Sequence, residues 1–137
     1  MNTPESLLTL SRAFQGSRVL LTGAELDVFT ALSKEVLTAD ALAARLGADA
    51  RAVTITLDAL AAMELLVKEN GTYRTAKDAT CLSAEAPDSI HPMLLHAAGL
   101  WDRWSGLTRK AGGTPLSERP RAEVTRAFIC PLANGRI

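Results

Sequence analysis

The side chains that could carry metal or redox chemistry are few and dispersed in this sequence. His91 and His96 are the two histidines, and because they are five residues apart in a segment of helical spacing, they point to different faces of the predicted helix. Cys81 and Cys130 are far apart and match no metal-ligand spacing. Since a zinc site needs three or four ligands, we expect no metal site and interpret both cysteines as buried or half-buried thiols of a reducing compartment.

The same histidines are weak candidates for acid–base catalysis. A histidine that acts as a general base needs a carboxylate to orient its ring. Asp88 and Asp102 are near in sequence, but no pattern indicates that either carboxylate meets an imidazole. We expect partly exposed helix histidines, with His96 in a pocket wall as the alternative.

Large apolar side chains gather in the segment that contains the histidines. Trp101 and Trp104 are three residues apart, with Met93, Leu100 and Leu107 on adjoining faces of the predicted helix. Core packing is the first interpretation of this cluster. The second is that these side chains line a pocket for a flat apolar ligand, because aromatic rings and methionine make good pocket walls.

Motifs that bind phosphate or activate a nucleophile are missing from the sequence. Neither GxGxxG nor GxxxxGK[ST] occurs, and no GxSxG is present. We therefore expect no catalytic residue and no cofactor-binding residue within this chain.

Composition predicts a soluble globular protein. The chain has 137 residues, of which 47% are hydrophobic and 22% charged, and its formal net charge is zero. The N-terminus, MNTPES, is not a secretory signal, and no apolar run is long enough to span a membrane. We expect a cytoplasmic protein with no membrane partner.

Two helices are predicted between Leu37 and Leu66. Thr38 is a good N-cap, Gly47 suits a left-handed C-terminal position, and Asp49 can cap the second helix. The second helix has two apolar stripes, one of Val53, Leu57, Leu60 and Ala61 and one of Ile55, Ala59, Ala62 and Leu66. Two stripes predict a helix that is buried on both sides.

A hairpin is predicted directly after these helices. Asn70-Gly71 is the strongest short hairpin signal and joins residues 66–69 to residues 72–75. Two helices followed by a hairpin are the outline of a winged helix. The fold class is therefore mainly α, a winged helix with additional N- and C-terminal helices.

A winged helix invites a DNA-binding hypothesis, which the charges disfavour. Arg51 is the only base of the second helix, and Glu69 offsets one of the basic residues around the hairpin, which are Lys68, Arg74 and Lys77. Because phosphate contacts dominate affinity for DNA and the chain has no basic excess, we expect no nucleic-acid partner.

Further helices flank this central part. Pro4 can open an N-terminal helix, which we expect to be interrupted at Gln15-Gly16-Ser17 and to be followed by a helix over 23–32. After the hairpin we expect a short turn or helix over 76–82, a helix from Ile90 to about Ala111, and a last helix from Glu118 or Arg121 to about Ile129.

The apolar face of the N-terminal helix has two interpretations. The candidate dimer-interface residues are Leu7, Leu10, Phe14 and Leu21. Either this face packs on its own domain, or it needs a partner chain, and the second interpretation is favoured because little of a small domain is left to cover it.

At this point the sequence resembles a known family, the N-terminal domain of the S-adenosylmethionine-dependent O-methyltransferases of the caffeic-acid and hydroxyindole type. The resemblance covers most of the chain in the family's order and rests on SRVLLTGAELDVFTAL (17–32), LTADALAARLGADARAVTITLDALAAMELLVKENGTYRTA (37–76) and LWDRWSGLTRKAGG (100–113).

The resemblance implies a dimerisation module that binds no DNA, forms an intertwined homodimer and helps close the substrate pocket of a catalytic domain. By region, it implies substrate-pocket candidates Met93, His96, Trp101 and Trp104. It also implies a division into a winged-helix dimerisation domain, residues 1–113, and a linker and helix, residues 114–137, that lead to a methyltransferase domain.

The cofactor implied for the full-length enzyme is S-adenosylmethionine, and its substrate would be an aromatic or polyketide-like small molecule. Because the chain ends abruptly at Ile137 without the family's glycine-rich loop or catalytic histidine, we expect a fragment of a longer enzyme. The alternatives are a stand-alone winged-helix transcriptional regulator and a stand-alone interaction module.

Overall fold

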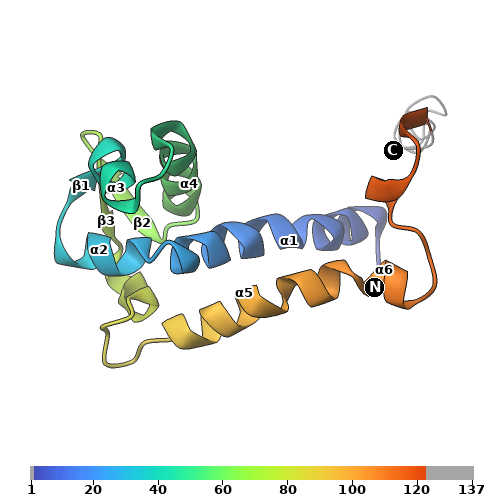
Figure 1. The fold of residues 1–137 in the computed structure, drawn as a ribbon. Coiled ribbons are helices and arrows are strands. Elements are labelled where there is room, and N and C mark those ends of the chain that lie inside the picture. Colours follow the sequence, from blue (N-terminus) through green and yellow to red (C-terminus); the bar gives the residue numbers. More distant parts are fainter. Residues whose placement is uncertain (1, 123–137) are drawn as a thin grey trace. The chain divides into compact units, whose positions relative to one another are not determined.

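The computed structural model describes residues 2–122, and its backbone contacts divide the chain into two compact units, Met1–Gly99 and Leu100–Ile137. Each unit is described by itself (Figure 1). The fold is mainly helical with a small three-stranded antiparallel sheet. Most of the expected last helix, over about 118–129, and Cys130 lie outside the described residues.

The first unit begins with one long helix, α1 (Pro4–Glu25). Thr3 caps it in a capping box with Ser6, and Pro4 occupies its first turn, as expected. The interruption expected at Gln15-Gly16-Ser17 is wrong, because the helix continues through these residues. A single glycine costs a helix only about 1 kcal/mol relative to alanine, which is too little to break a helix of this length.

The chain instead breaks at Asp27, between α1 and α2 (Val28–Lys34), so the continuous helix expected over 23–32 is also wrong. Asp27 has a φ of 53°, in the left-handed region, and its carboxylate accepts a hydrogen bond of 2.5 Å from the Thr30 hydroxyl. Aspartate tolerates this conformation better than most residues. The turn brings Val28 and Phe29, which are 1% and 0% exposed, into the core.

The helix pair and hairpin form as the sequence predicts. Thr38 caps α3 (Ala39–Leu46) by accepting from the amide of Ala41, and Asp49 caps α4 (Ala50–Ala62) in the same way. Gly47 ends α3 with a φ of 61°. The cap positions and the glycine therefore set the bounds of both helices.

The sheet contains β1 (Leu37–Thr38), β2 (Leu66–Glu69) and β3 (Thr72–Thr75) in the order β1-β3-β2. Glu69 pairs with Thr72 across the turn, which confirms the predicted hairpin. Asn70 and Gly71 have φ values of 50° and 77°, the positive values that a type I′ turn requires.

One core holds these elements together. Its fully buried side chains come from α2, α3, α4 and β3, and the largest are Tyr73, Phe29, Leu32, Leu42, Leu57, Leu60 and Val28. The C-terminal end of α1 joins this core through Leu21 and Ala24, which are 6% and 1% exposed. By contrast, residues 2–15 are all exposed in the single chain.

The chain leaves the sheet through a 3₁₀ helix, η1 (Lys77–Leu82), and then enters α5 (His91–Ser105). The single helix expected from Ile90 to about Ala111 is divided at Gly106, after which α6 (Leu107–Lys110) and η2 (Leu116–Glu118) follow. Gly106 has a φ of −85° and a ψ of 4°, outside the α-helical region, and this turn separates the two helices. Among the described helices, none is long and apolar enough to cross a membrane.

The packing of α1 on the core requires a glycine at position 23. A Cβ atom built on Gly23 would lie 2.9 Å from Cε2 of Phe29 and 3.1 Å from Cδ1 of Leu60. These distances are too short for a methyl group, and the Phe29 ring is fully buried. Helix α1 therefore packs so closely on the core at this position that only glycine fits without a shift of its neighbours.

We predict that Gly23→Ala lowers the free energy of unfolding by about 1–3 kcal/mol, the usual cost of overpacking a core. The matched control is Gly99→Ala, also inside a helix, where an added Cβ would meet nothing within 4 Å. The control should leave stability unchanged or raise it by up to about 1 kcal/mol. Urea unfolding at one chain concentration measures both, and equal stabilities of the two variants would contradict the close packing at Gly23.

Candidate interaction surface

The four substrate-pocket candidates are divided between the two units. Met93, 71% exposed, and His96, also exposed, belong to the first unit, whereas Trp101, half-buried, and Trp104, 69% exposed, belong to the second. The interpretation of Trp104 as a core residue is therefore wrong, because its side chain is exposed in the described part of the chain. The exposed apolar side chains of this group remain available for contact with another surface.

His91 is buried, so the expectation of a partly exposed helix histidine is wrong for this residue. Its side chain is only 11% exposed, and its Nε2 lies 2.9 Å from the carbonyl oxygen of Ala24 and 3.6 Å from a carboxylate oxygen of Asp27. Because a carbonyl only accepts hydrogen bonds, Nε2 carries the proton of this contact. The side chain fixes the first turn of α5 to the corner between α1 and α2.

No signal in the sequence pointed to this contact of His91, because Ala24 is 67 residues away along the chain. The carboxylate beside the ring is that of Asp27, not that of the sequence neighbours Asp88 and Asp102. The arrangement has an imidazole and an acid but no nucleophile. It therefore serves to position α5. Within residues 2–122, no group of three or more His, Cys, Asp or Glu side chains could hold a metal ion.

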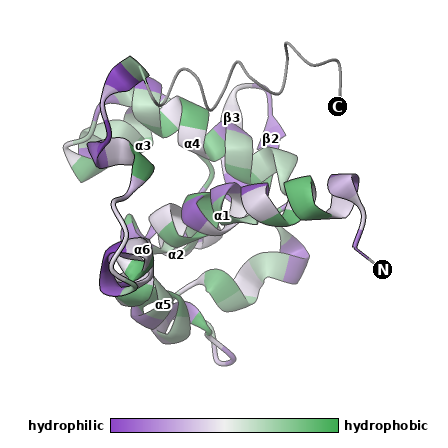
Figure 2. Cartoon of the chain, turned by 90° about the vertical axis from the view of Figure 1, so that its right-hand side faces the viewer, coloured by the Kyte–Doolittle hydropathy of each residue, from purple (hydrophilic) through white to green (hydrophobic). Residues whose placement is uncertain are grey.

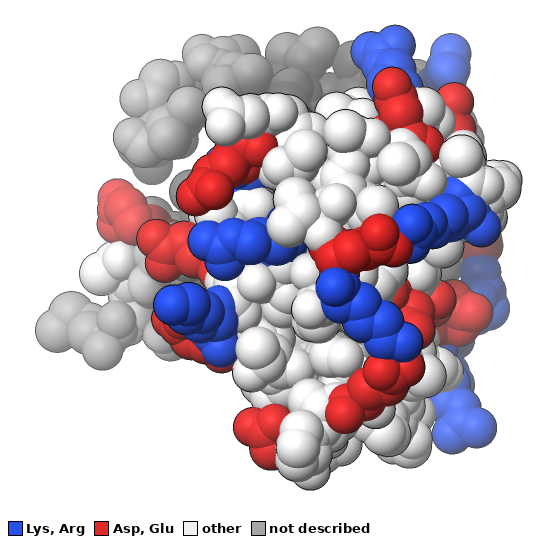
Figure 3. Space-filling model, turned by 90° about the vertical axis from the view of Figure 1, so that its left-hand side faces the viewer, with Lys and Arg blue, Asp and Glu red and all other residues white. Residues whose placement is uncertain are grey.

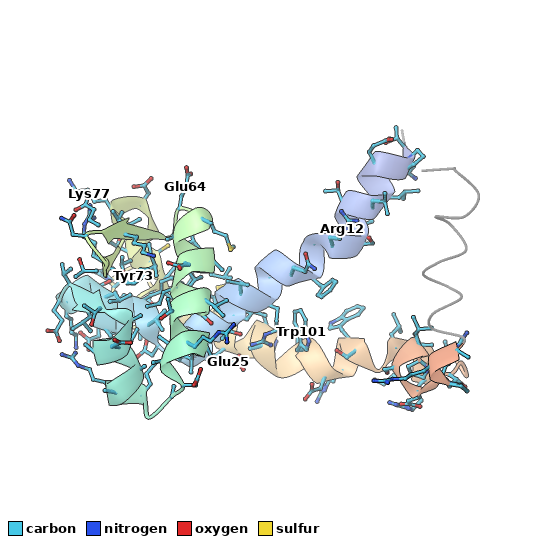
Figure 4. The ribbon with its side chains drawn as sticks, turned by 90° about the horizontal axis from the view of Figure 1, so that it is seen from above. Arg12, Glu25, Glu64, Tyr73, Lys77 and Trp101 are labelled. Carbon is cyan, nitrogen blue, oxygen red and sulfur yellow. The ribbon has the colours of Figure 1, made fainter. Side chains whose placement is uncertain are left out.

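The N-terminal half of α1 presents a group of exposed apolar side chains. It projects away from the compact part that contains α3, α4 and the sheet, as the position of Arg12 in Figure 4 shows. Its exposed apolar residues are Leu7 (50%), Leu8 (47%), Leu10 (72%) and Phe14 (56%). Figure 2 shows hydrophobic residues along this helix. Leu21, the fourth dimer-interface candidate, is instead buried within its own chain.

Helix α4 is buried on one side only, so the expected burial of both stripes is wrong in the single chain. Val53, Leu57 and Leu60 of the inner stripe are at most 3% exposed. On the outer side, Ile55 is 60% exposed, and Ala62 is exposed as well. A second apolar surface is therefore available on α4.

A polar cluster fixes α4 to the hairpin. The carboxylate of Asp58 accepts hydrogen bonds of 2.7 Å from Lys68 and 2.6 Å from the Tyr73 hydroxyl, and the Lys68 ammonium lies 5.3 Å from the centre of the Tyr73 ring. The hydrogen bonds from Lys68 and Tyr73 hold the pKa of Asp58 below its usual value. Burial and the neighbouring carboxylate raise the pKa of Tyr73.

Acidic and basic side chains lie next to one another on the surface of the first unit. Lys34 pairs with Glu85 at 2.6 Å, Lys68 with Asp58, and Arg45 with Glu35. Figure 3 shows acidic and basic side chains interspersed on one face of the molecule, with no continuous basic stripe there. This pattern does not supply the row of phosphate contacts that binding to duplex DNA requires.

A small helical domain whose longest helix carries its apolar side chains into solvent belongs to the class of modules that associate with another chain. Residues 8–85, more than half of the chain, match the O-methyltransferase dimerisation domain family. The chain belongs to this family.

Individual relatives agree with this assignment. Over 74 residues the chain is 42% identical to the tetracenomycin polyketide synthesis 8-O-methyl transferase TcmO of Streptomyces glaucescens, a match that covers 53% of this chain and 22% of TcmO. The chain therefore spans about a fifth of the curated relative that it matches.

Two solved structures are similar to the fold. An O-methyltransferase family protein from Burkholderia thailandensis superposes with a TM-score of 0.71 at 27% identity, over 80% of this chain and 33% of that one. Human N-acetylserotonin methyltransferase, solved in complex with SAM, gives a TM-score of 0.69 at 24% identity, over 94% of this chain and 41% of that one. The second comparison shows likeness of fold alone.

We predict that the cluster of Asp58 makes stability depend on pH. Because the folded pKa of Asp58 is lowered, the carboxylate stabilises the fold above its unfolded pKa, about 3.9, and this contribution is lost as the pH falls through the folded pKa. Asp58→Asn should therefore be less stable than wild type near neutral pH, and the difference should shrink below about pH 4.

Urea unfolding followed by circular dichroism over this pH range tests the effect of Asp58. The control is Asp88→Asn, an exposed loop carboxylate, whose stability difference from wild type should stay small throughout. A difference in the free energy of unfolding between wild type and Asp58→Asn that stays constant as the pH falls would contradict the role assigned to the carboxylate.

Proposed function

We propose that this chain is the homodimerisation and substrate-lid domain of a longer, small-molecule S-adenosylmethionine-dependent O-methyltransferase. The observation that carries the proposal is the exposed apolar face of α1 in a chain that belongs to the O-methyltransferase dimerisation domain family. Burying one such side chain is worth roughly 1.5–3 kcal/mol, so several per copy support a stable dimer.

In this proposal, α3, α4 and the β2–β3 hairpin form a winged helix that serves assembly. The proposed domain covers residues 1–113, and residues 114–137 are the linker and helix that lead to the methyltransferase domain. Support comes from the order of two capped helices and a hairpin. The regulator alternative has no support from the family or from the interspersed charges.

The described residues do not fit S-adenosylmethionine itself. The three strands are at most four residues long and antiparallel, and no glycine-rich loop joins a strand to a helix among them. We therefore assign the cofactor to the methyltransferase domain of the proposed full-length enzyme. SAM is the cofactor named for the human N-acetylserotonin methyltransferase structure, which supports this choice.

The proposed substrate is an aromatic or polyketide-like molecule, and the enzyme would act in the cytoplasm. Met93, His96, Trp101 and Trp104 are the proposed contributions of this chain to the substrate pocket. TcmO acts in the synthesis of a polyketide by its name, and the aromatic and thioether side chains of three of these residues suit a flat apolar surface.

We predict that the chain is a dimer and that Phe14→Asp separates it. A buried unpaired carboxylate costs on the order of 3–5 kcal/mol, which raises the dissociation constant by at least about a hundredfold. Light scattering over a concentration series measures the effect. Thr9→Asp, on the opposite side of the same exposed helix, is the control and should remain dimeric. A wild-type chain that is monomeric at high micromolar concentration would overturn the proposal.

We also predict that the chain does not bind duplex DNA specifically. Helix α4 has one base, Arg51, and its Asp58 is engaged with the hairpin. A gel-shift titration at physiological salt should show only weak binding that does not depend on sequence. A nanomolar, sequence-dependent complex would favour the regulator alternative.

A further inference from the structure

The segment from the end of η1 to the middle of α5 is held on the first unit by little buried surface. Among residues 84–99, all of which the structure describes, His91 alone is buried. Leu94 is partly buried and packs against the core, whereas Met93 is 71% and Leu95 42% exposed. A segment with few buried apolar contacts belongs to the least stable parts of a domain.

The start of this segment is attached to the corner between α1 and α2 through Thr30. The amide of Ala84 donates a hydrogen bond of 2.8 Å to the hydroxyl of Thr30, which in turn donates to Oδ1 of Asp27. Thr30 is a buried residue. The neighbouring ion pair of Lys34 with Glu85 is exposed on both sides and therefore contributes little.

The second attachment of the segment lies beside the same carboxylate oxygen. Nε2 of His91 donates to the carbonyl oxygen of Ala24 at 2.9 Å and lies 3.6 Å from Oδ1 of Asp27. One oxygen atom of Asp27 thus adjoins both attachments, although a whole loop separates Ala84 from His91 along the chain. Because polar groups in one network support one another, loss of one attachment weakens the other.

The segment is bounded by a buried point and a glycine. Before its start, Leu82 and Ser83 are each 5% exposed and belong to the buried part of the unit. At its end, Gly99 lies inside α5, and a Cβ atom there would meet nothing within 4 Å, so packing does not require a glycine at this position. Glycine weakens a helix relative to alanine, and small residues are common at hinges.

We propose that residues 84–99 form a lid that opens in one step while the core of the first unit stays folded. The contacts of Thr30 and His91 at the corner are the latch that holds the lid closed, and Gly99 is its hinge. Met93 and His96 lie on the lid, so opening moves two of the proposed pocket residues. The role of the lid as a gate to a substrate pocket rests on the proposed function, whereas its opening does not.

Native-state hydrogen exchange of the intact chain tests the lid, because each amide reports the free energy of the opening that exposes it. Rates are compared after division by those of an unstructured chain. The amides of Ala84 and of residues 94–99 should share one opening. They should exchange at least about tenfold faster than the amides of Leu57 and Leu60, which are fully buried in α4.

The first variant, His91→Phe, keeps a ring in the buried site and removes the donor to Ala24. It should raise the exchange of residues 94–99 and of Ala84 alike, by roughly tenfold, although the hydrogen bond of Ala84 to Thr30 is not altered. The control is His96→Phe, at an exposed position of the same helix. It should change neither rate by more than about twofold.

The second variant, Val53→Ala, weakens the core instead of the lid. Val53 is 3% exposed and belongs to α4, which packs on α1, α3 and β2. The substitution should raise the exchange of the buried α4 amides by at least about tenfold. The lid amides should stay within about twofold of wild type, because the lid opens without the core.

Two results would overturn the inference. Lid amides that accelerate as much as the α4 amides in Val53→Ala would mean that α5 opens only when the whole unit unfolds. An effect of His91→Phe on residues 94–99 that does not reach Ala84 would mean that the two attachments open independently. Neither result depends on dimerisation, so a monomeric wild-type chain would refute the proposed function and leave the lid in place.

Discussion

The close packing of α1 on the core at Gly23 is the contact on which the rest of the first unit depends. Phe29 and Leu60 come from α2 and α4, and both approach the helix at Gly23, where no side chain stands between them and the backbone. The left-handed turn at Asp27 then separates α2 from α1. Because this contact lies at the C-terminal end of α1, the other end of the helix extends beyond the core.

The contact at Gly23 also explains how one helix serves two purposes. Leu21 and Ala24 are buried with the core, whereas Leu10 and Phe14, about two to four turns earlier, are exposed. The apolar stripe of α1 is thus buried in the core near the C-terminal end of the helix and exposed near its N-terminal end. A family of dimerisation domains needs this division, since the domain must fold around its own core and still present an apolar face.

Much of the local structure could be predicted from the sequence, because adjacent residues encode it. The caps at Thr38 and Asp49 and the turn at Asn70-Gly71 depend on the chemistry of a few neighbouring residues. The break at Asp27 and the burial of His91 depend on residues far away in the chain. The two stripes of α4 were visible in the sequence, but periodicity does not say whether the second stripe meets its own chain or another one.

The length of the exposed part of α1 has a consequence for the energetics of assembly. A helical extension of about three turns without neighbours frays readily in water, because each residue added to a helix gains little free energy from propagation alone. Part of the free energy of association is therefore spent on ordering this segment. Affinity between copies then depends on the helix propensity of positions outside the apolar face, such as Thr9, as well as on the leucines that make contact, and a substitution that never touches the partner can tighten the complex by preorganising α1.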